Sequence, residues 1–407
     1  MAGQHPPAAH ADLRRHRGDV RQRVTNVELF FDLVYVFAVT QLSHYVGAHL
    51  SLTGVLKAGL LLAMVWLLWA YTTWVTNWLD PEKIQVRLLL LSLMLVGLAM
   101  SAVLPQAFDS GSGLAGLLVG CAYAVMQIGR SVFTVLALPA GSLRRNFQRI
   151  LAWCCLSGGC AVAGGVWAQA RVPLWLAAVA IDLIGGGVGF YTPGLGRSST
   201  SEWDIEGGHF AERCQAFILI ALGESIVVTG AALAALSASH RPVGGQAVAA
   251  FCVAFVSSAG LWWLYFDRSA EAAAEVIARS ADPGRLGRSA YHFVHPVMVA
   301  GIIVTAAADR SVLADPAAVG VASTAWLILG GTGLYIAGLA AFKAVVWRLL
   351  SWPRLAALAA LGLLGLAAPH LSALALSGCA AAVVLAVAAA DAVSASRDRI
   401  AAARAAS

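Results

Sequence analysis

The stretch VELFFDLVYVFAVTQL, residues 27–42, decides the class of fold, because it places Glu28 and Asp32 inside an otherwise apolar segment. A second stretch, FILIALGESIVVTG at residues 217–230, places Glu224 near its centre. A charged side chain at the middle of a bilayer costs at least ~2.5–3.5 kcal/mol on insertion scales, so such groups face a bundle interior or a water-filled cavity. The pattern predicts a polytopic membrane protein with a polar interior.

Composition supports this class of protein. The chain has 407 residues, of which 59% are hydrophobic and only 12% are charged, whereas a soluble protein carries roughly 25% charged residues. Apolar runs of about 20 residues match the ~30 Å of hydrocarbon that a helix must cross. The net charge of +6 would suggest nucleic acid as a partner of a soluble protein. Here the basic residues cluster in alternate loops, so we expect a lipid bilayer as partner and no nucleic acid.

Hydropathy predicts an all-α chain with about twelve transmembrane helices, of which the eleventh is the shortest. The expected spans are 26–47, 54–79, 87–105, 113–138, 147–169, 172–190, 211–235, 245–266, 288–308, 317–342, 355–369 and 371–392. With the N-terminus inside, only four of the 27 lysines and arginines fall in outer segments, namely Lys57, Arg171, Arg241 and Arg310. The positive-inside rule therefore predicts that both termini are cytoplasmic.

Landmarks near the helix ends recur and suggest a six-helix unit used twice. Glu28 and Glu212 open the first and seventh helices, Asp80 and Asp267 close the second and eighth, and Arg87 and Arg288 open the third and ninth. Because six is even, both halves would enter the membrane in the same direction, related by a pseudo-two-fold axis along its normal. The expected division is a disordered cytoplasmic arm 1–24, a first half 25–190, a linker 191–210, a second half 211–392 and a cytoplasmic tail 393–407.

Glu28 and Asp32 are four residues apart and share one helix face. Two ionised carboxylates so close repel each other, which favours protonation of one of them. They are therefore either a proton or cation site near the cytoplasmic side, a structural ion pair, or a solvated helix end. Asp32 lies roughly 9 Å into its helix, and Arg130 lies at similar depth in the fourth helix. We expect Asp32 or Glu28 to be the partner of Arg130, with Arg87 and Asp80 as further structural charges.

Glu224 and Asp182 are the deepest acids of their helices. Glu224 is either a protonatable functional group or a protonated acid that donates one interhelical hydrogen bond. Asp182 precedes the glycine run 185–189, which breaks the helix at a cavity or allows close packing. We count Asp182 among the structural charges.

Other side chains have simpler interpretations. His44 and His295 are packing residues or members of a proton relay. Metal binding would need three or four convergent ligands, and we expect neither a metal nor a cofactor. Trp66, Trp69, Trp74 and Trp78 are expected to be lipid-facing or interfacial anchors. The GxSxG, HExxH and P-loop motifs are absent from the sequence, so we do not expect an enzyme.

Three stretches resemble the bacterial low-temperature-requirement A (LtrA) family: VELFFDLVYVFAVTQLSH, AERCQAFILIALGESIVVTG and, more loosely, YHFVHPVMVAGIIVTAA. The resemblance runs from about residue 25 to about residue 390. It implies a multi-pass protein of the bacterial inner (cytoplasmic) membrane, in a family named for a need during growth in the cold. The family's motif positions fall on Glu28, Asp32, Gln41, His44, Glu212, Gly223, Glu224, Ser225 and His295.

The first helix alone is also similar to the Phe-Ser-Asp helix of a non-canonical potassium-channel family that repeats six helices. Phe30 and Asp32 match that motif, but Phe31 stands where the motif has serine. In the second half, Ala216 stands where the aspartate should be.

These observations favour a transporter-like protein that binds a small solute or ion between its halves. Glu28, Asp32, Gln41, His44, Glu212, Glu224, Ser225 and His295 are the candidate substrate, ion or proton-site residues. The alternatives are a non-transporting component with a lipid-binding, assembly or sensory role, and a cation channel. A transporter needs a hydrated cavity that reaches the acids, whereas a scaffold would seal them in pairs. The substrate and the oligomeric state do not follow from the sequence.

Overall fold

The computed structural model describes residues 13–15, 24–109, 113–198, 207–238, 244–267 and 269–406, and within these ranges it contains helices and isolated bridges but no strands. The α-helices are α1 Asn26–Ala48, α2 Leu52–Trp78, α3 Ile84–Val103, α4 Gly113–Ala137, α5 Ser142–Val166, α6 Arg171–Gly187, α7 Gly207–Ala238, α8 Gly245–Phe266, α9 Ser269–Ala278, α10 Pro283–Gly287, α11 His295–Ala314, α12 Ala322–Trp347, α13 Trp352–Ala367 and α14 Ala373–Ala406. A π-helical segment, Arg288–Val294, joins α10 to α11.

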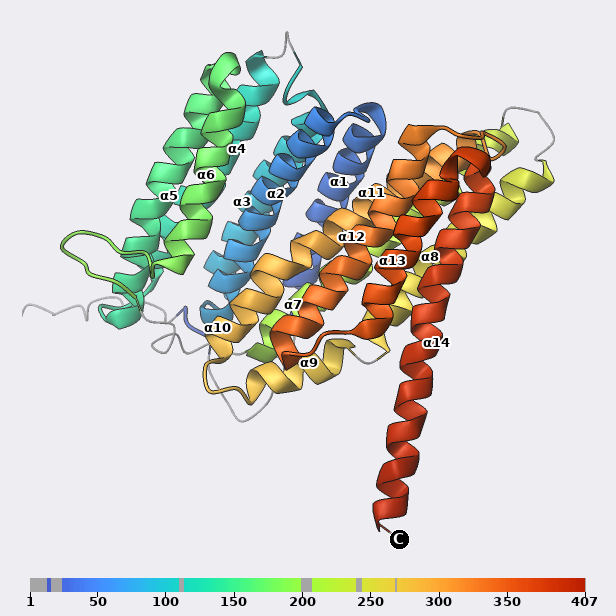
Figure 1. Ribbon diagram of the computed structural model, residues 1–407. Coiled ribbons are helices and arrows are strands. Elements are labelled where there is room, and N and C mark those ends of the chain that lie inside the picture. Colours follow the sequence, from blue (N-terminus) through green and yellow to red (C-terminus); the bar gives the residue numbers. More distant parts are fainter. Residues whose placement is uncertain are drawn as a thin grey trace, which may run out of the picture.

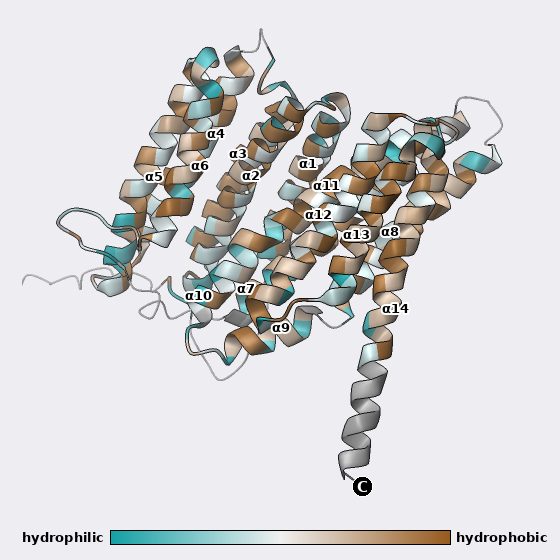
Figure 2. Ribbon diagram, viewed as in Figure 1, coloured by the Kyte–Doolittle hydropathy of each residue, from teal (hydrophilic) through white to brown (hydrophobic). Residues whose placement is uncertain are grey.

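Twelve helical segments of the described chain are long and apolar enough to cross a membrane. This number confirms the all-α, twelve-span prediction, including the short eleventh span, which comprises α13 and the turn after it, Trp352–His370. Hydrophobic residues cover most of the helix length and hydrophilic residues gather toward the ends and loops (Figure 2). The chain is therefore an integral, multi-pass membrane protein.

We call helices α1–α6 the first half and helices α7–α14 the second half, and α1–α3 lie between α4–α6 and the second half (Figure 1). The halves meet where α1 and α2 contact α7 and α11. We call the side on which α1 begins the inner face, and the short helix α9 lies across the bundle on that side. The predicted pseudo-two-fold axis and domain boundaries stay predictions, and residues 199–206 of the predicted linker lie outside the described residues.

Helix α2 is the central helix of the first half. All four of its tryptophans, Trp66, Trp69, Trp74 and Trp78, are buried, so the expectation that they anchor the protein in lipid is wrong. Trp66, Trp69 and Trp74 pack against aromatic side chains of α7, namely Phe217 and Phe210. An indole covers a large area and also carries one N–H donor, which suits it to an interface between helix groups that contains buried polar atoms.

Two boundaries differ from the sequence prediction for identifiable reasons. The tenth span begins at Ala322 rather than near residue 317, because Gly320 adopts a positive φ of 69° and ends the preceding turn. Part of the predicted disordered arm is ordered: the Asp80 N–H donates to the Leu13 carbonyl, and the Arg15 N–H donates to the Trp78 carbonyl. Residues 13–15 thereby lie against the inner end of α2.

Helices α4 and α5 pack closely through glycine, which gives a testable prediction. A Cβ at Gly120 would lie 2.3 Å from the carbonyl oxygen of Ala161, whereas a Cβ at Gly129 on the same helix has no atom within 4 Å. Gly120→Ala should therefore lower the free energy of unfolding by about 1–3 kcal/mol. Gly129→Ala is the matched control and should not destabilise the protein. Equilibrium unfolding in mixed micelles measures both, and equal stability of the two variants would contradict the packing.

Candidate functional site between the two halves

The two acids of α1 meet an arginine of the second half. Both carboxylates are fully buried, and so is Arg213 near the start of α7. Its Nη2 and Nε donate to Oδ1 and Oδ2 of Asp32 over 2.5 and 3.1 Å, and its Nη1 lies 3.3 Å from Oε1 of Glu28. The indole of Trp69 donates a further hydrogen bond of 2.7 Å to Asp32. Such a bidentate pair has the geometry in which a guanidinium binds a carboxylate most strongly.

Glu28 has additional partners. It closes a capping box at the start of α1, where its Oε2 accepts from the backbone N–H and the hydroxyl of Thr25. Nε2 of His209, one turn before Arg213, lies 2.9 Å from Oε1 of Glu28. Arg15 lies 3.4 Å from the other carboxylate oxygen. We call Glu28, Asp32, His209, Arg213 and Arg15 the inner charge cluster. Of the three interpretations of Glu28 and Asp32 that the sequence left open, this cluster corresponds to the structural ion pair.

Arg130 is not part of this cluster, so its predicted pairing with Asp32 or Glu28 is wrong. Its Nη2 donates to the side-chain oxygen of Gln127, and its Nη1 lies 3.3 Å from the hydroxyl of Thr72. The guanidinium carbon lies 5.2 Å from the ring centroid of Tyr71, a cation–π distance. The prediction used only the depth of each residue along its helix, which does not determine the faces through which two helices contact each other. In the structure, Arg130 on α4 lies toward α2 and α6.

Asp182 is the buried acid of that region. One of its oxygens accepts hydrogen bonds from the Tyr123 hydroxyl and from the side-chain amide of Gln127, which in turn accepts from Arg130. Among the described residues, its other oxygen, Oδ1, has no well-aligned hydrogen-bond partner, although the hydroxyl of Ser157 is close to the carboxylate. Asp182 and Arg130 are therefore linked through Gln127 rather than by a direct ion pair.

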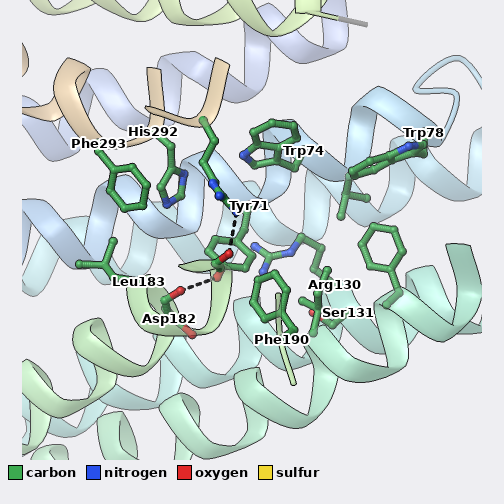
Figure 3. A pocket seen from close by; sticks show the side chains of 15 residues that line it. Tyr71, Trp74, Trp78, Arg130, Ser131, Asp182, Leu183, Phe190, His292 and Phe293 are labelled. Carbon is green, nitrogen blue, oxygen red and sulfur yellow. Dashed lines mark hydrogen bonds between the residues drawn. The ribbon is translucent and has the colours of Figure 1, made fainter. Parts of the chain in front are cut away.

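A small pocket separates these residues from the second half. It encloses a cavity of about 40 Å³, which is room for about three water molecules. Figure 3 shows side chains from several helices gathered around it. The lining residues are Tyr71, Trp74, Val75 and Trp78 of α2, Arg130 and Ser131 of α4, Phe147 and Ile150 of α5, Asp182, Leu183 and Gly186 of α6, Phe190, and Arg288, His292 and Phe293 of the π-helical segment. We call it the inter-half pocket.

Two interruptions of helical geometry shape this pocket. Pro296 has no N–H to donate to the carbonyl of His292, and the indole of Trp66 donates to that carbonyl instead, over 2.9 Å. On the other wall, α6 ends at Gly187, and the side chain of Arg288 donates to the carbonyl of Gly186 over 2.6 Å. π-Helical turns inside α-helices occur frequently at functional sites. At each interruption, a hydrogen bond connects the first half to the second.

Glu224 lies at a separate place, about three helical turns beyond Arg213 on α7. It is buried, and within the described chain its Oε1 has no well-aligned hydrogen-bond partner. The hydroxyl of Thr40 on α1 is near its carboxyl group, and Arg310 of α11 is near enough to interact electrostatically. Arg310 donates to the Ser43 hydroxyl over 2.8 Å. We call Glu224, Thr40, Ser43 and Arg310 the outer polar group, because it spans the same boundary between the halves.

The remaining predicted residues do not converge. Gln41 and Glu212 are half-buried, while His44 and Arg87 are exposed. Ser225 is buried beside Glu224, and its carbonyl accepts a hydrogen bond from Thr229. Asp80 accepts from the backbone N–H of Glu82 and so closes a turn, and the Arg87 side chain donates to the carbonyl of Glu82.

His295 has the geometry of a packing residue. It is fully buried, its Nε2 lies 2.7 Å from the Tyr265 hydroxyl, and its ring contacts Tyr291 and Phe342. No group of three or more histidine, cysteine, aspartate or glutamate side chains in the described ranges could hold a metal ion.

Sequence reasoning missed His209, Arg213, Tyr71, Arg288 and His292 as site residues. A signal for the first two was present: Glu28 and Asp32 are four apart on α1, and His209 and Arg213 are four apart on α7. Each of these two pairs presents one helix face, and the acids of one could have been matched to the arginine and histidine of the other. The other three depend on which helices are neighbours, which the spacing along one chain does not show.

Comparison with known proteins fits this architecture. The family model for bacterial low temperature requirement A protein (LtrA) matches residues 23–389. An uncharacterized protein of Rhizobium meliloti (strain 1021) is 35% identical over 344 residues, which cover 84% of this chain and 81% of that protein. No solved structure matches the chain. The match over residues 23–389, most of the chain, shows that it belongs to the bacterial low temperature requirement A family.

Proposed function

We propose that the chain is a transporter-like protein that moves a small solute or ion across the membrane between its two halves. The supporting observation is the inter-half pocket, where both halves contribute charged side chains whose hydrogen-bonding capacity is not used up. Transporter binding sites lie at the interface of two helical units and are formed by interrupted helices. The π-helical turn before α11 and the glycine-rich end of α6 fit that description.

The protonatable groups of this proposal are Asp182 and Glu224. A carboxylate that alternates between charged and neutral forms can couple proton movement to the release of a substrate. Each of these two acids has one oxygen without a well-aligned partner in the described structure. Glu28 and Asp32 are instead held by Arg213, so in this proposal they join the halves rather than carry protons. A pore role for Asp32, as in a cation channel, has less support for the same reason.

Cysteine accessibility tests this function without a known substrate. Ser131 lines the inter-half pocket, and Thr134 lies one turn further along the same helix, equally buried but outside the pocket. Ser131→Cys should react with a small membrane-impermeant thiol reagent at least about tenfold faster than Thr134→Cys, because reaction requires an accessible thiolate. Reaction in right-side-out and in inside-out membrane vesicles shows from which side the reagent reaches the cysteine. The unmodified chain gives the background reaction of the native cysteines. Equal protection of both cysteines from both sides would contradict a transport pathway here.

The same experiment addresses the second candidate, a non-transporting membrane component. The sealed inner charge cluster favours it, because fully paired charges contribute to a scaffold and not to a pathway. A scaffold predicts protection of Ser131→Cys under all conditions, and a transporter predicts access that changes with pH.

The location that suits either function is the bacterial cytoplasmic membrane with both termini inside. The distribution of basic residues supports this orientation, and the twelve candidate spans of the described chain, an even number, are consistent with both ends of the helical region on one side. A reporter that is active only in the cytoplasm, fused to the C-terminus, tests this orientation. An inactive reporter would overturn the orientation.

A further inference from the structure

The charges around the inter-half pocket are unequal. Two guanidinium groups, Arg130 and Arg288, line it together with a single carboxylate, Asp182. Within the described chain, neither arginine forms an ion pair. Arg130 is fully buried, and a buried guanidinium without a counter-charge is unfavourable in the membrane interior. Asp282 interacts electrostatically with Arg288 but does not line the pocket, so the lining itself has one more positive than negative group, which one anion would balance.

Two residues of the pocket lining, Arg288 and His292, have buried polar atoms without partners. Nε of Arg288 and Nδ1 of His292 are both buried, and neither has a hydrogen-bond partner among the described residues. The two residues are one turn apart on the π-helical segment. The imidazole of His292 packs against Tyr71 with ring centroids 6.0 Å apart, and Figure 3 shows it beside Tyr71 on the side away from Arg130. An unsatisfied buried polar atom is unfavourable. A bound ion or water that accepts from Nε of Arg288, and from Nδ1 of His292 in the tautomer that carries its proton there, would therefore be stabilised.

We infer that the inter-half pocket binds one small inorganic monovalent anion, held by Arg288 and His292, that Arg130 on the other side of Tyr71 attracts it at longer range, and that a proton on Asp182 strengthens its binding. This inference rests on the proposed function and names its substrate class. A pocket with about 40 Å³ of free space has room for a halide or a small planar oxyanion. A cation is disfavoured there, because two guanidinium groups would repel it at close range.

The pH dependence follows from charge. Asp182 is faced by Tyr71 of α2, by Tyr123 and Arg130 of α4, by Cys154 of α5, and by Arg288 and His292 of the π-helical segment. Protonation of Asp182 removes the only negative charge of this group while both arginines stay positive. An anion should therefore bind more tightly at low pH, and release of the proton should favour release of the anion.

Chloride titration of the purified full-length protein tests this. Potassium chloride replaces potassium gluconate at constant ionic strength, at pH 6 and at pH 8, and the readouts are tryptophan fluorescence and melting temperature. Trp74 and Trp78 line the pocket, so the fluorescence change should be saturable. We expect an apparent Kd about tenfold lower at pH 6 than at pH 8, and Asp182→Asn should bind at pH 8 as tightly as the unmodified protein does at pH 6.

Two arginine variants distinguish an effect of the pocket on anion binding from a general effect of positive charge. Arg288→Gln should raise the Kd for chloride at least about tenfold, the loss expected for one charge-assisted hydrogen bond. Arg285→Gln, three residues earlier with a side chain that is 69% exposed, should leave it unchanged. The melting temperature in gluconate shows whether each variant is folded, and His292→Ala provides a second test should Arg288→Gln fail to fold.

The possible outcomes distinguish failure of the anion site from failure of the proposed transport function. An absent or unsaturable response to chloride and to nitrate overturns the anion site, as does an equal loss in Arg285→Gln and Arg288→Gln. A pH dependence that persists in Asp182→Asn overturns the role of Asp182. Saturable binding without chloride flux into proteoliposomes supports the anion site and contradicts transport. Accessibility of Ser131→Cys without any anion effect supports transport and overturns this inference.

Discussion

Arg213→Gln is expected to lower the free energy of unfolding by about 3–5 kcal/mol, because it leaves Glu28 and Asp32 buried without their shared counter-charge. Both carboxylates are fully buried, and Arg213 contacts each of them. Glutamine can donate one hydrogen bond but carries no charge. Equilibrium unfolding in mixed micelles, followed by tryptophan fluorescence, measures the loss, and Trp69 reports on it directly because its indole is bonded to Asp32.

Two controls show whether charge pairing is the cause. Arg279→Gln removes an arginine whose side chain is 82% exposed and should change stability by less than about 0.5 kcal/mol. The triple variant Glu28→Gln, Asp32→Asn and Arg213→Gln removes both carboxylates together with Arg213 and should be more stable than Arg213→Gln alone, since it leaves no buried carboxylate without its counter-charge. A triple variant less stable than Arg213→Gln would mean that shape, not charge, holds the cluster together.

A double-mutant cycle also separates Arg213 from Arg130. Asp32→Asn should couple to Arg213→Gln by about 0.5–3 kcal/mol, the range seen for residues in one network. It should couple only weakly to Arg130→Gln, because Arg130 is bonded to Gln127 and lies near Thr72 instead. The reverse order of coupling would restore the pairing that the sequence suggested.

Hydropathy and length were sufficient to predict the transmembrane architecture, because the bilayer fixes the length of each span and excludes unpaired backbone. The same physics made Glu28, Asp32 and Glu224 recognisable as sheltered groups, and all three are buried. These predictions depend on one variable, position along the membrane normal. That variable can be estimated from a single sequence.

The direction in which a helix face points cannot be estimated in this way. Arg130 and Arg213 were both available partners for Asp32, and only the packing of α1 against α7 decides between them. The tryptophans of α2 illustrate the same difficulty: an amphipathic ring suits a lipid interface as well as a buried boundary that contains polar atoms, and α2 is central. The inter-half pocket depends on four helices and a π-helical turn, so no local pattern encodes it.

Glu224→Gln is expected to abolish proton coupling while leaving the fold intact. In proteoliposomes that contain a pH-sensitive dye, an inward chloride gradient should drive proton uptake by the unmodified protein, and Glu224→Gln should reduce the rate at least about tenfold, as expected for a member of an intramembrane proton relay. Glutamine has nearly the shape of glutamic acid but cannot release a proton. Because Oε1 of Glu224 has no well-aligned partner in the described structure, the substitution breaks little and should cost little stability.

The control for this experiment is Glu275→Gln on α9, whose carboxylate is 59% exposed, and it should transport protons at the unmodified rate. The contrast with Asp32→Asn is equally informative. Asp32 is held by three hydrogen bonds from Arg213 and Trp69, so its substitution should reduce stability, whereas substitution of Glu224 should reduce coupling. A Glu224→Gln protein that is well folded and retains the full rate of proton uptake would remove Glu224 from the pathway, and the outer polar group would then be part of the packing between α1, α7 and α11.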